Sequence, residues 1–145
     1  MAGYGSSKAI VPHVKATVFR AASIERWKDA QCLHAADRFQ GAIYLCGYAL
    51  ECELKYCVCV ARRIARMEEG EAKRLGHELF RLLNEAGMVE RLNTNRDLFL
   101  AFHRINSRWS TEIRYSGEVS SRTESEGFLK DSWWLLQWLR TAPKS

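Results

Sequence analysis

The chain has 145 residues, of which 47% are hydrophobic, and its 22 lysines and arginines outnumber its 17 aspartates and glutamates. This length suits one domain that buries a core without disulfides, so a second domain is not required. The mild positive charge permits contact with nucleic acid but falls well short of demonstrating it.

Residues 1–22 are predicted to be a loose lead-in because they contain Gly3, Gly5 and a short Ser-Ser-Lys run. The first helix is expected to begin near Ser23 and to end around residues 37–41. No apolar segment follows a basic start at the N-terminus, so no secretory signal is expected. The five cysteines are odd in number and fall within helical patterns, which favours a reducing, cytoplasmic location.

Residues 41–61 form an apolar run of helical length that carries Glu51, Glu53 and Lys55. An ionised side chain at the middle of a bilayer costs about 2.5–3.5 kcal/mol, whereas each strongly apolar residue returns only about 0.3–0.6 kcal/mol. The three charges therefore outweigh the apolar residues, and we predict a buried helix without a membrane partner. Glu51 and Lys55 stand four residues apart with the acid first, the favourable order for an ion pair on one helical face.

Further helices are expected beyond this run. The second helix is predicted to continue to about residue 74, with Gly70 as a possible break, and a third helix to occupy residues 77–87 with Gly87 as its left-handed cap. A fourth helix begins with Thr94 as a candidate N-cap, and Ser121 and Glu124 form a capping-box pattern for a last helix. The chain between about residues 108 and 121 is left unassigned. At least about 60% helix is expected, with no sheet beyond a stray pair of residues.

The last helix contains Trp133, Trp134 and Trp138, which cannot all point to one side. This aromatic surface exceeds one core face, so we predict an exposed apolar patch that serves a homodimer or another protein partner.

The sequence contains little that supports a metal site or a catalytic nucleophile. Cys52, Cys57 and Cys59 lack a paired Cys-x-x-Cys pattern and a neighbouring group of histidines, so no metal site and no cofactor are expected. His77 is interpreted as a helix-capping residue rather than a catalytic one.

Four segments together resemble the HEPN superfamily of small α-helical proteins. They are RFQGAIYLCGYALECELK at residues 38–55, GHELFRLLNEAG at 76–87, RWSTEIRYS at 108–116, and the closing WWLLQWLR at 133–140. The resemblance implies an all-α fold, namely an up-and-down four-helix bundle core with an additional helix, spanning residues 23–141 and usually forming a homodimer. A Glu and a Lys one turn apart in the second helix also belong to this pattern.

Many members of this family are metal-independent endoribonuclease toxins paired with a nucleotidyltransferase antitoxin, and their signature is an Arg, a polar residue and a later His. Arg96, Asp97 and His103 match it here. The alignment of the surrounding pattern, however, places the family's Arg near Arg114, and no His follows position 103. We therefore interpret His103 as an ordinary histidine and Arg96 as a solvated residue.

Two functions remain open from the sequence. The first is a non-catalytic or weakly active HEPN module that binds RNA, nucleotide or a partner nucleotidyltransferase, with Glu51, Lys55, Arg114 and Tyr115 as candidate binding residues. The second is a metal-independent endoribonuclease toxin of a toxin-antitoxin system that uses Arg96 to hold the scissile phosphate and His103 to move the proton of the 2′-hydroxyl.

Overall fold

The computed structural model describes residues 11–109 and 120–142, so the candidate binding residues Arg114 and Tyr115 lie outside the described residues. Helices hold 78% of the described residues, which confirms the predicted all-α bundle. The helices are α2 (Ala16–Ala35), α3 (Phe39–Ala61), α4 (Glu69–Leu75), α5 (Leu79–Glu85), α6 (Val89–Asn93), α7 (Arg96–Arg108) and α8 (Arg122–Thr141), and the strands are β1 (His13–Lys15) and β2 (Arg66–Glu68).

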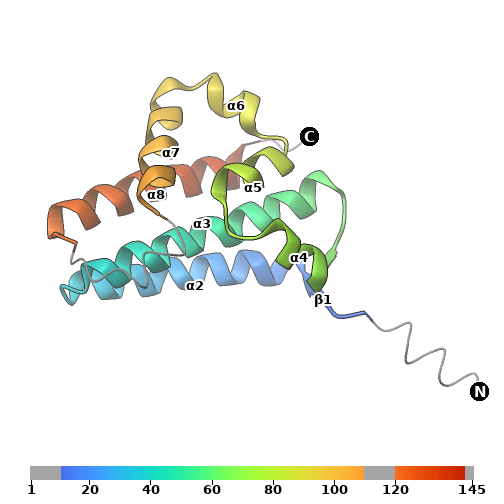
Figure 1. Ribbon diagram of the computed structural model, residues 1–145, viewed down its shortest axis with the longest axis horizontal. Coiled ribbons are helices and arrows are strands. Elements are labelled where there is room, and N and C mark those ends of the chain that lie inside the picture. Colours follow the sequence, from blue (N-terminus) through green and yellow to red (C-terminus); the bar gives the residue numbers. More distant parts are fainter. Residues whose placement is uncertain (1–10, 110–119, 143–145) are drawn as a thin grey trace, which may run out of the picture.

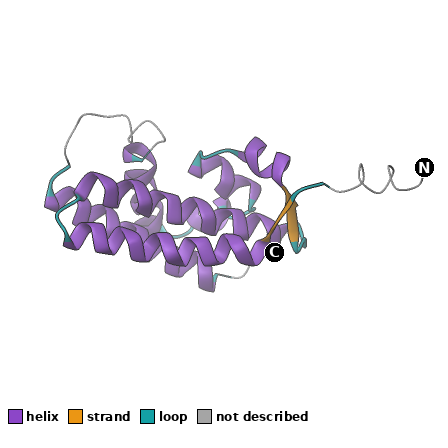
Figure 2. Cartoon of the chain, turned by 90° about the horizontal axis from the view of Figure 1, so that it is seen from below, coloured by secondary structure: helices purple, strands orange, loops and turns teal. Residues whose placement is uncertain are grey.

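The three longest helices, α2, α3 and α8, lie lengthwise beside one another, and α2 runs opposite to the other two (Figure 1). Helix α7 runs across this layer and packs on α8, while the short helix α5 packs on α3 and α4 packs on β2 (Figure 1). The strands form a small antiparallel ribbon at the same end as the start of α2 (Figure 2). None of the helices in the described ranges has the length and apolarity that a membrane crossing requires.

The first helix begins at Ala16, well before the predicted start near Ser23. The expected boundary between lead-in and domain at residues 22 and 23 therefore falls inside a continuous helix. The reason is tertiary: the Ala16 amide donates to the carbonyl of Ala65, and Ala16 and Phe19 both pack into the core. These contacts with a distant part of the chain order a segment whose own sequence gives only a weak helical signal.

The second helix ends at Ala61, and the prediction that it continues to about residue 74 is wrong. Arg63 adopts a positive φ of 57°, and the chain reverses there into β2. Met67 of β2 pairs with Val14 of β1 and is 1% exposed. Burial of the Met67 side chain therefore stabilises the two-stranded ribbon of β1 and β2. This sheet was not expected, and Gly70 lies inside α4 instead of breaking a longer helix.

Three capping signals were predicted at other helix ends, and the structure shifts one of them. Gly87 has a φ of 69° after α5, and Ser121 and Glu124 form the complete capping box of α8, which confirms both predictions. The N-cap of α7 is Asn95 instead of Thr94, because the Asn95 side chain accepts the Leu98 amide at 3.2 Å. Helix α6 was not predicted.

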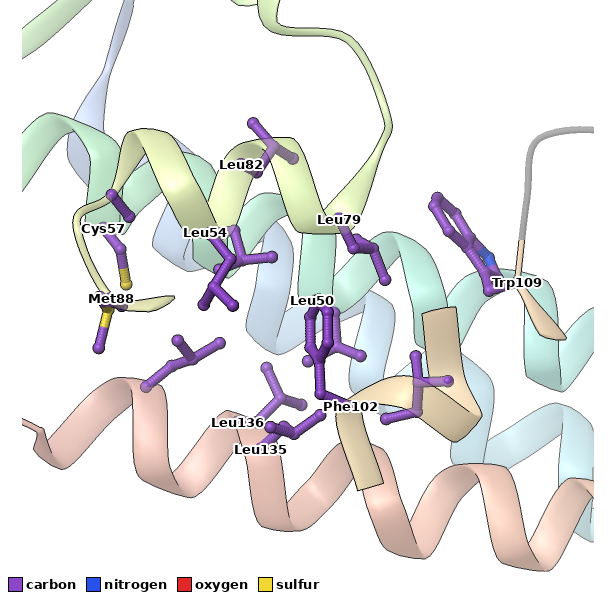
Figure 3. Packing of buried hydrophobic residues seen from close by; sticks show 14 of the residues in the cluster. Leu50, Leu54, Cys57, Leu79, Leu82, Met88, Phe102, Trp109, Leu135 and Leu136 are labelled. Atoms are coloured by element: carbon purple, nitrogen blue, oxygen red, sulfur yellow. The ribbon is translucent and has the colours of Figure 1, made fainter. Parts of the chain in front are cut away.

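The described helices all contribute side chains to one core, and Figure 3 shows the part of it around α3. Leu50 and Leu54 of α3 face Phe102 of α7, with Leu135 and Leu136 of α8 beneath them. The remaining labelled members are Cys57, Leu79, Leu82, Met88 and Trp109. Helix α3 is therefore the central element, and its polar residues occur within a helix that is buried along most of its length.

Candidate functional site

The centre of the candidate site is the carboxylate of Glu51 on α3, which is 2% exposed. The Lys55 ammonium donates to Glu51 Oε2 at 3.1 Å, and the Lys55 side chain is itself only 10% exposed. The predicted ion pair is thus present and buried. A buried charge is tolerated only when it is paired and hydrogen-bonded, and both conditions hold for Glu51.

The second oxygen of Glu51 accepts a hydrogen bond from His77, which was predicted to cap the following helix. His77 Nδ1 lies 2.9 Å from Glu51 Oε1, and because an ionised carboxylate only accepts, this nitrogen carries the proton. The prediction that His77 caps the following helix is wrong, since the N-cap of α5 is Glu78 and no side chain caps it. Gly76, with φ 70° and ψ −148°, sets the backbone turn that brings His77 back onto α3.

His77 is the accessible member of this cluster, because its side chain is 52% exposed while Glu51 and Lys55 are buried. Nδ1 is engaged by Glu51, and among the described residues the other ring nitrogen, Nε2, has no hydrogen-bond partner. A carboxylate that fixes the tautomer of a histidine is a common arrangement in catalytic and binding sites.

The face of α3 that carries Tyr44, Gly47, Tyr48, Glu51 and Lys55 is called the α3 stripe. The ring centroids of Tyr44 and Tyr48 are 6.3 Å apart. Burial, followed by the nearby charge of Glu51, raises the pKa of Tyr48 above its ordinary value of 10.0. Burial likewise raises the pKa of the neighbouring Cys52 thiol to about 12. Neither group ionises near neutral pH, so the hydroxyl of Tyr48 is a hydrogen-bonding group and Cys52 is not a nucleophile.

Trp109, which follows α7, packs its ring against Gly47 of α3. A Cβ added at Gly47 would lie 2.1 Å from atoms of this ring, so only glycine fits. The indole Nε1–H donates to the Tyr44 carbonyl at 3.0 Å. Two of the segments that carry the HEPN resemblance, 76–87 and 108–116, therefore contact the helix formed by a third segment, through His77 and Trp109.

Arg96 and His103 both lie exposed on α7. Seven residues at about 100° each bring them to within about 20° of one another around the helix, on the side opposite the buried Ile105. The His103 ring packs on Phe99, with centroids 4.3 Å apart. Within the described part of the chain, neither side chain forms a hydrogen bond or an ion pair. Arg96 and His103 therefore share one face of α7, and that face is exposed to solvent.

A groove of about 790 Å³ runs between α7 and α8. Its walls include Arg104 and Arg108 of α7 and the tryptophans Trp133 and Trp134 of α8. These tryptophans are 42% and 43% exposed, as expected for an apolar patch, whereas Trp138 packs against the core. Trp133 also stacks on Trp27 of α2 with a centroid separation of 5.0 Å.

Sequence reasoning missed the surroundings of Glu53, which is 0% exposed. Arg20 of α2 donates to Glu53 Oε2 at 2.8 Å, and Arg140 of α8 donates to Glu53 Oε1 at 3.4 Å. A glutamate within an apolar run signals a buried partner, but the partners are 33 and 87 residues away and no local pattern identifies them.

Among the described residues, no group of three or more His, Cys, Asp or Glu side chains gathers closely enough to hold a metal ion. Cys46, one of the buried cysteines, has its pKa raised to about 12 by burial. It behaves as a small apolar side chain.

Comparisons with known proteins add no assignment. No family model matches the chain, and neither a curated protein nor a solved structure matches it.

Proposed function

We propose that this protein is a HEPN-like module, non-catalytic or weakly active, that forms a homodimer and binds RNA, nucleotide or a partner nucleotidyltransferase. In this proposal, Glu51 and Lys55 do not contact the ligand themselves, because both are buried. They hold His77, whose exposed ring offers the contact.

One observation carries the proposal. His77 and Trp109 come from two separate segments of the HEPN pattern, and they contact the α3 stripe at Glu51 and Gly47. Residues from distant parts of a sequence that converge on one partly exposed polar stripe are typical of a binding site. The unusual backbone of Gly76 beside His77 fits the same interpretation, since such conformations gather at functional positions.

The test is the binding of single-stranded RNA and of ATP, measured by fluorescence anisotropy and calorimetry. His77→Gln should weaken binding by at least about tenfold, because the site loses its exposed imidazole while the amide keeps a hydrogen-bonding group. His13→Gln is the matched control, since His13 is exposed on β1 and remote from α3 in sequence. Equal losses in both variants would contradict a role for the α3 stripe. A small nucleotidyltransferase encoded next to this protein would favour a toxin-antitoxin pair.

The alternative is a metal-independent endoribonuclease that uses Arg96 and His103, and their common exposed face on α7 favours it. If this pair is catalytic, His103→Ala should lower RNA cleavage in EDTA by at least about 100-fold, the lower range for loss of a general base. We expect instead little cleavage by the native protein, because both side chains lie on an open face. Robust cleavage that disappears in His103→Ala would overturn the non-catalytic proposal.

A further inference from the structure

The exposed face of α8 that borders the groove carries one small and one large residue. Gly127 and Trp134 both line this groove, and Lys130 lies between them. They are seven residues apart, so on a helix they stand on nearly the same line, about 10.5 Å from one another. This face of α8 is therefore shallow at Gly127 and, two helical turns later, carries the projecting ring of Trp134.

Among the described residues, nothing occupies the space beside Gly127. A Cβ added there would meet nothing within 4 Å, and Gly127 lies inside α8, away from both ends. Apart from proline, glycine is the residue that most disfavours a helix interior. Gly47 contrasts with it, because the Trp109 ring occupies the space a side chain would need. A glycine on an exposed helical face that lines a groove permits the close approach of a group that is not among the described residues.

The charges of the groove do not suit a polyanion. Arg104 forms a two-pronged ion pair with Asp131, at 2.8 and 2.9 Å, and Arg108 Nε lies 3.7 Å from Glu124. These arginines are therefore already matched by carboxylates, which leaves Lys130 as the cation of the groove without an ion pair among the described residues. Exposed tryptophans together with neutralised arginines are typical of protein interfaces.

We propose that a second copy of this chain covers the groove, with the two α8 helices antiparallel and Trp134 of each copy seated over Gly127 of the other. The proposal rests on the homodimer of the proposed function and adds its contact geometry. A twofold interface requires a surface that complements itself, and a glycine and a tryptophan on one line meet this requirement. The twofold axis then passes near Lys130 and Asp131, which brings Lys130 close to Asp131 of the second copy.

Exchange of the two residues tests this geometry by sedimentation velocity and native mass spectrometry. Gly127→Trp should place two rings in the same space, and Trp134→Gly should leave a hole, so each variant alone should weaken dimerisation by at least about tenfold. An equimolar mixture should form the heterodimer with near-native affinity, since both of its contacts again join one tryptophan and one glycine. Circular dichroism of each variant checks that the fold is intact.

Two further variants keep the test decisive. Gly127→Ala should raise the thermal stability of the monomer because alanine favours a helix, yet it should weaken the dimer. Phe80→Ala is the control, because Phe80 is 39% exposed on α5, outside the groove, and should leave dimerisation unchanged.

A monomeric native protein, or variants that fail to complement in the mixture, would overturn the proposal. Quenching of tryptophan fluorescence by RNA that is lost in Trp134→Phe, in a monomeric protein, would assign the groove to RNA instead.

If the native protein dimerises but no Gly127 or Trp134 variant alters it, the homodimer stands and the α8 contact is wrong. If the mixture complements but neither RNA nor ATP binds and no nucleotidyltransferase associates, the α8 contact stands and the proposed function fails.

Discussion

Glu51 combines two roles at the scale of a single residue. Its carboxylate compensates the buried Lys55 and also orients His77, which reaches the surface. Because one oxygen serves each partner, loss of Lys55 leaves the hydrogen bond to His77 in place. The stability of the helix and the orientation of the exposed ring can therefore be separated by substitution.

Lys55→Met is expected to destabilise the protein by about 2–4 kcal/mol, because it leaves a buried carboxylate without its cation. The double variant Glu51→Gln/Lys55→Met removes the stranded charge and should recover part of this loss. The free energy of unfolding in urea measures both. An unchanged value for Lys55→Met would show that the pair contributes nothing to stability.

Gly47→Ala is expected to destabilise by about 1–3 kcal/mol, the usual cost of an added methyl group in a packed interior, because the Trp109 ring must shift. The shift should also change the fluorescence of Trp109. Gly70→Ala is the matched control, since a Cβ at Gly70 meets nothing within 4 Å and alanine favours α4. Equal stability of the two variants would argue against the packing of Trp109 on α3.

At the scale of elements, ion pairs join the C-terminal end of α3 to the short helices α4 and α5. Arg62 donates to Glu71 of α4 at 2.7 Å and to Glu85 of α5 at 3.2 Å, and Arg74 completes the group with two hydrogen bonds to Glu71. Helices of seven residues are marginal alone, so their placement depends on such contacts and on buried leucines.

This group predicts a specific response to acid. Hydrogen bonds from Arg74 and then Arg62 lower the pKa of Glu71 from 4.5 to about 2. Because the folded pKa is depressed, the stabilising contribution is complete above about pH 4.5 and is lost as the pH falls toward 2. Glu71→Gln should therefore lose less stability than the native protein between pH 5 and pH 2.5, as measured by urea unfolding at each pH. A parallel decline in both proteins would contradict the pairing.

The elements that the sequence predicts well are those whose signals are local. The capping box at Ser121, the cap at Gly87 and the ion pair of Glu51 with Lys55 depend on residues no more than four positions apart, and the structure contains all three. The early start of α2, the ribbon and the contact of His77 with Glu51 depend on residues far apart in the chain. For His77, a local cap competes with a distant carboxylate, and only the folded chain decides between them.

At the scale of the whole molecule, Glu53 joins the three long helices. It accepts from Arg20 of α2 and Arg140 of α8, and Arg20 also stacks over the Tyr56 ring at 4.1 Å from its centroid. The Glu53 carboxylate is 0% exposed, so burial of its negative charge is tolerated because these two cations compensate it.

Arg20→Met is expected to destabilise by about 2–4 kcal/mol, and Arg140→Met by less, because the Arg140 contact is the longer one. Arg26→Met is the control, since its partner Asp29 is half exposed, and it should change stability by no more than about 0.5 kcal/mol. Chemical denaturation of the three variants gives the order. The reverse order for Arg20 and Arg140 would show that α8, rather than α2, supplies the main compensation.

The position of Glu53 also has a consequence for folding during synthesis. Arg20 and Glu53 leave the ribosome early and can pair as soon as α2 and α3 form a hairpin, whereas Arg140 emerges 87 residues after Glu53. At about 5–20 residues per second, this interval lasts several seconds or more. During that time one oxygen of Glu53 remains without its second cation, and the apolar surface that α8 later covers remains open to chaperones. Docking of α8 removes both features at once, because Arg140 then reaches Glu53 and the helix covers this apolar surface.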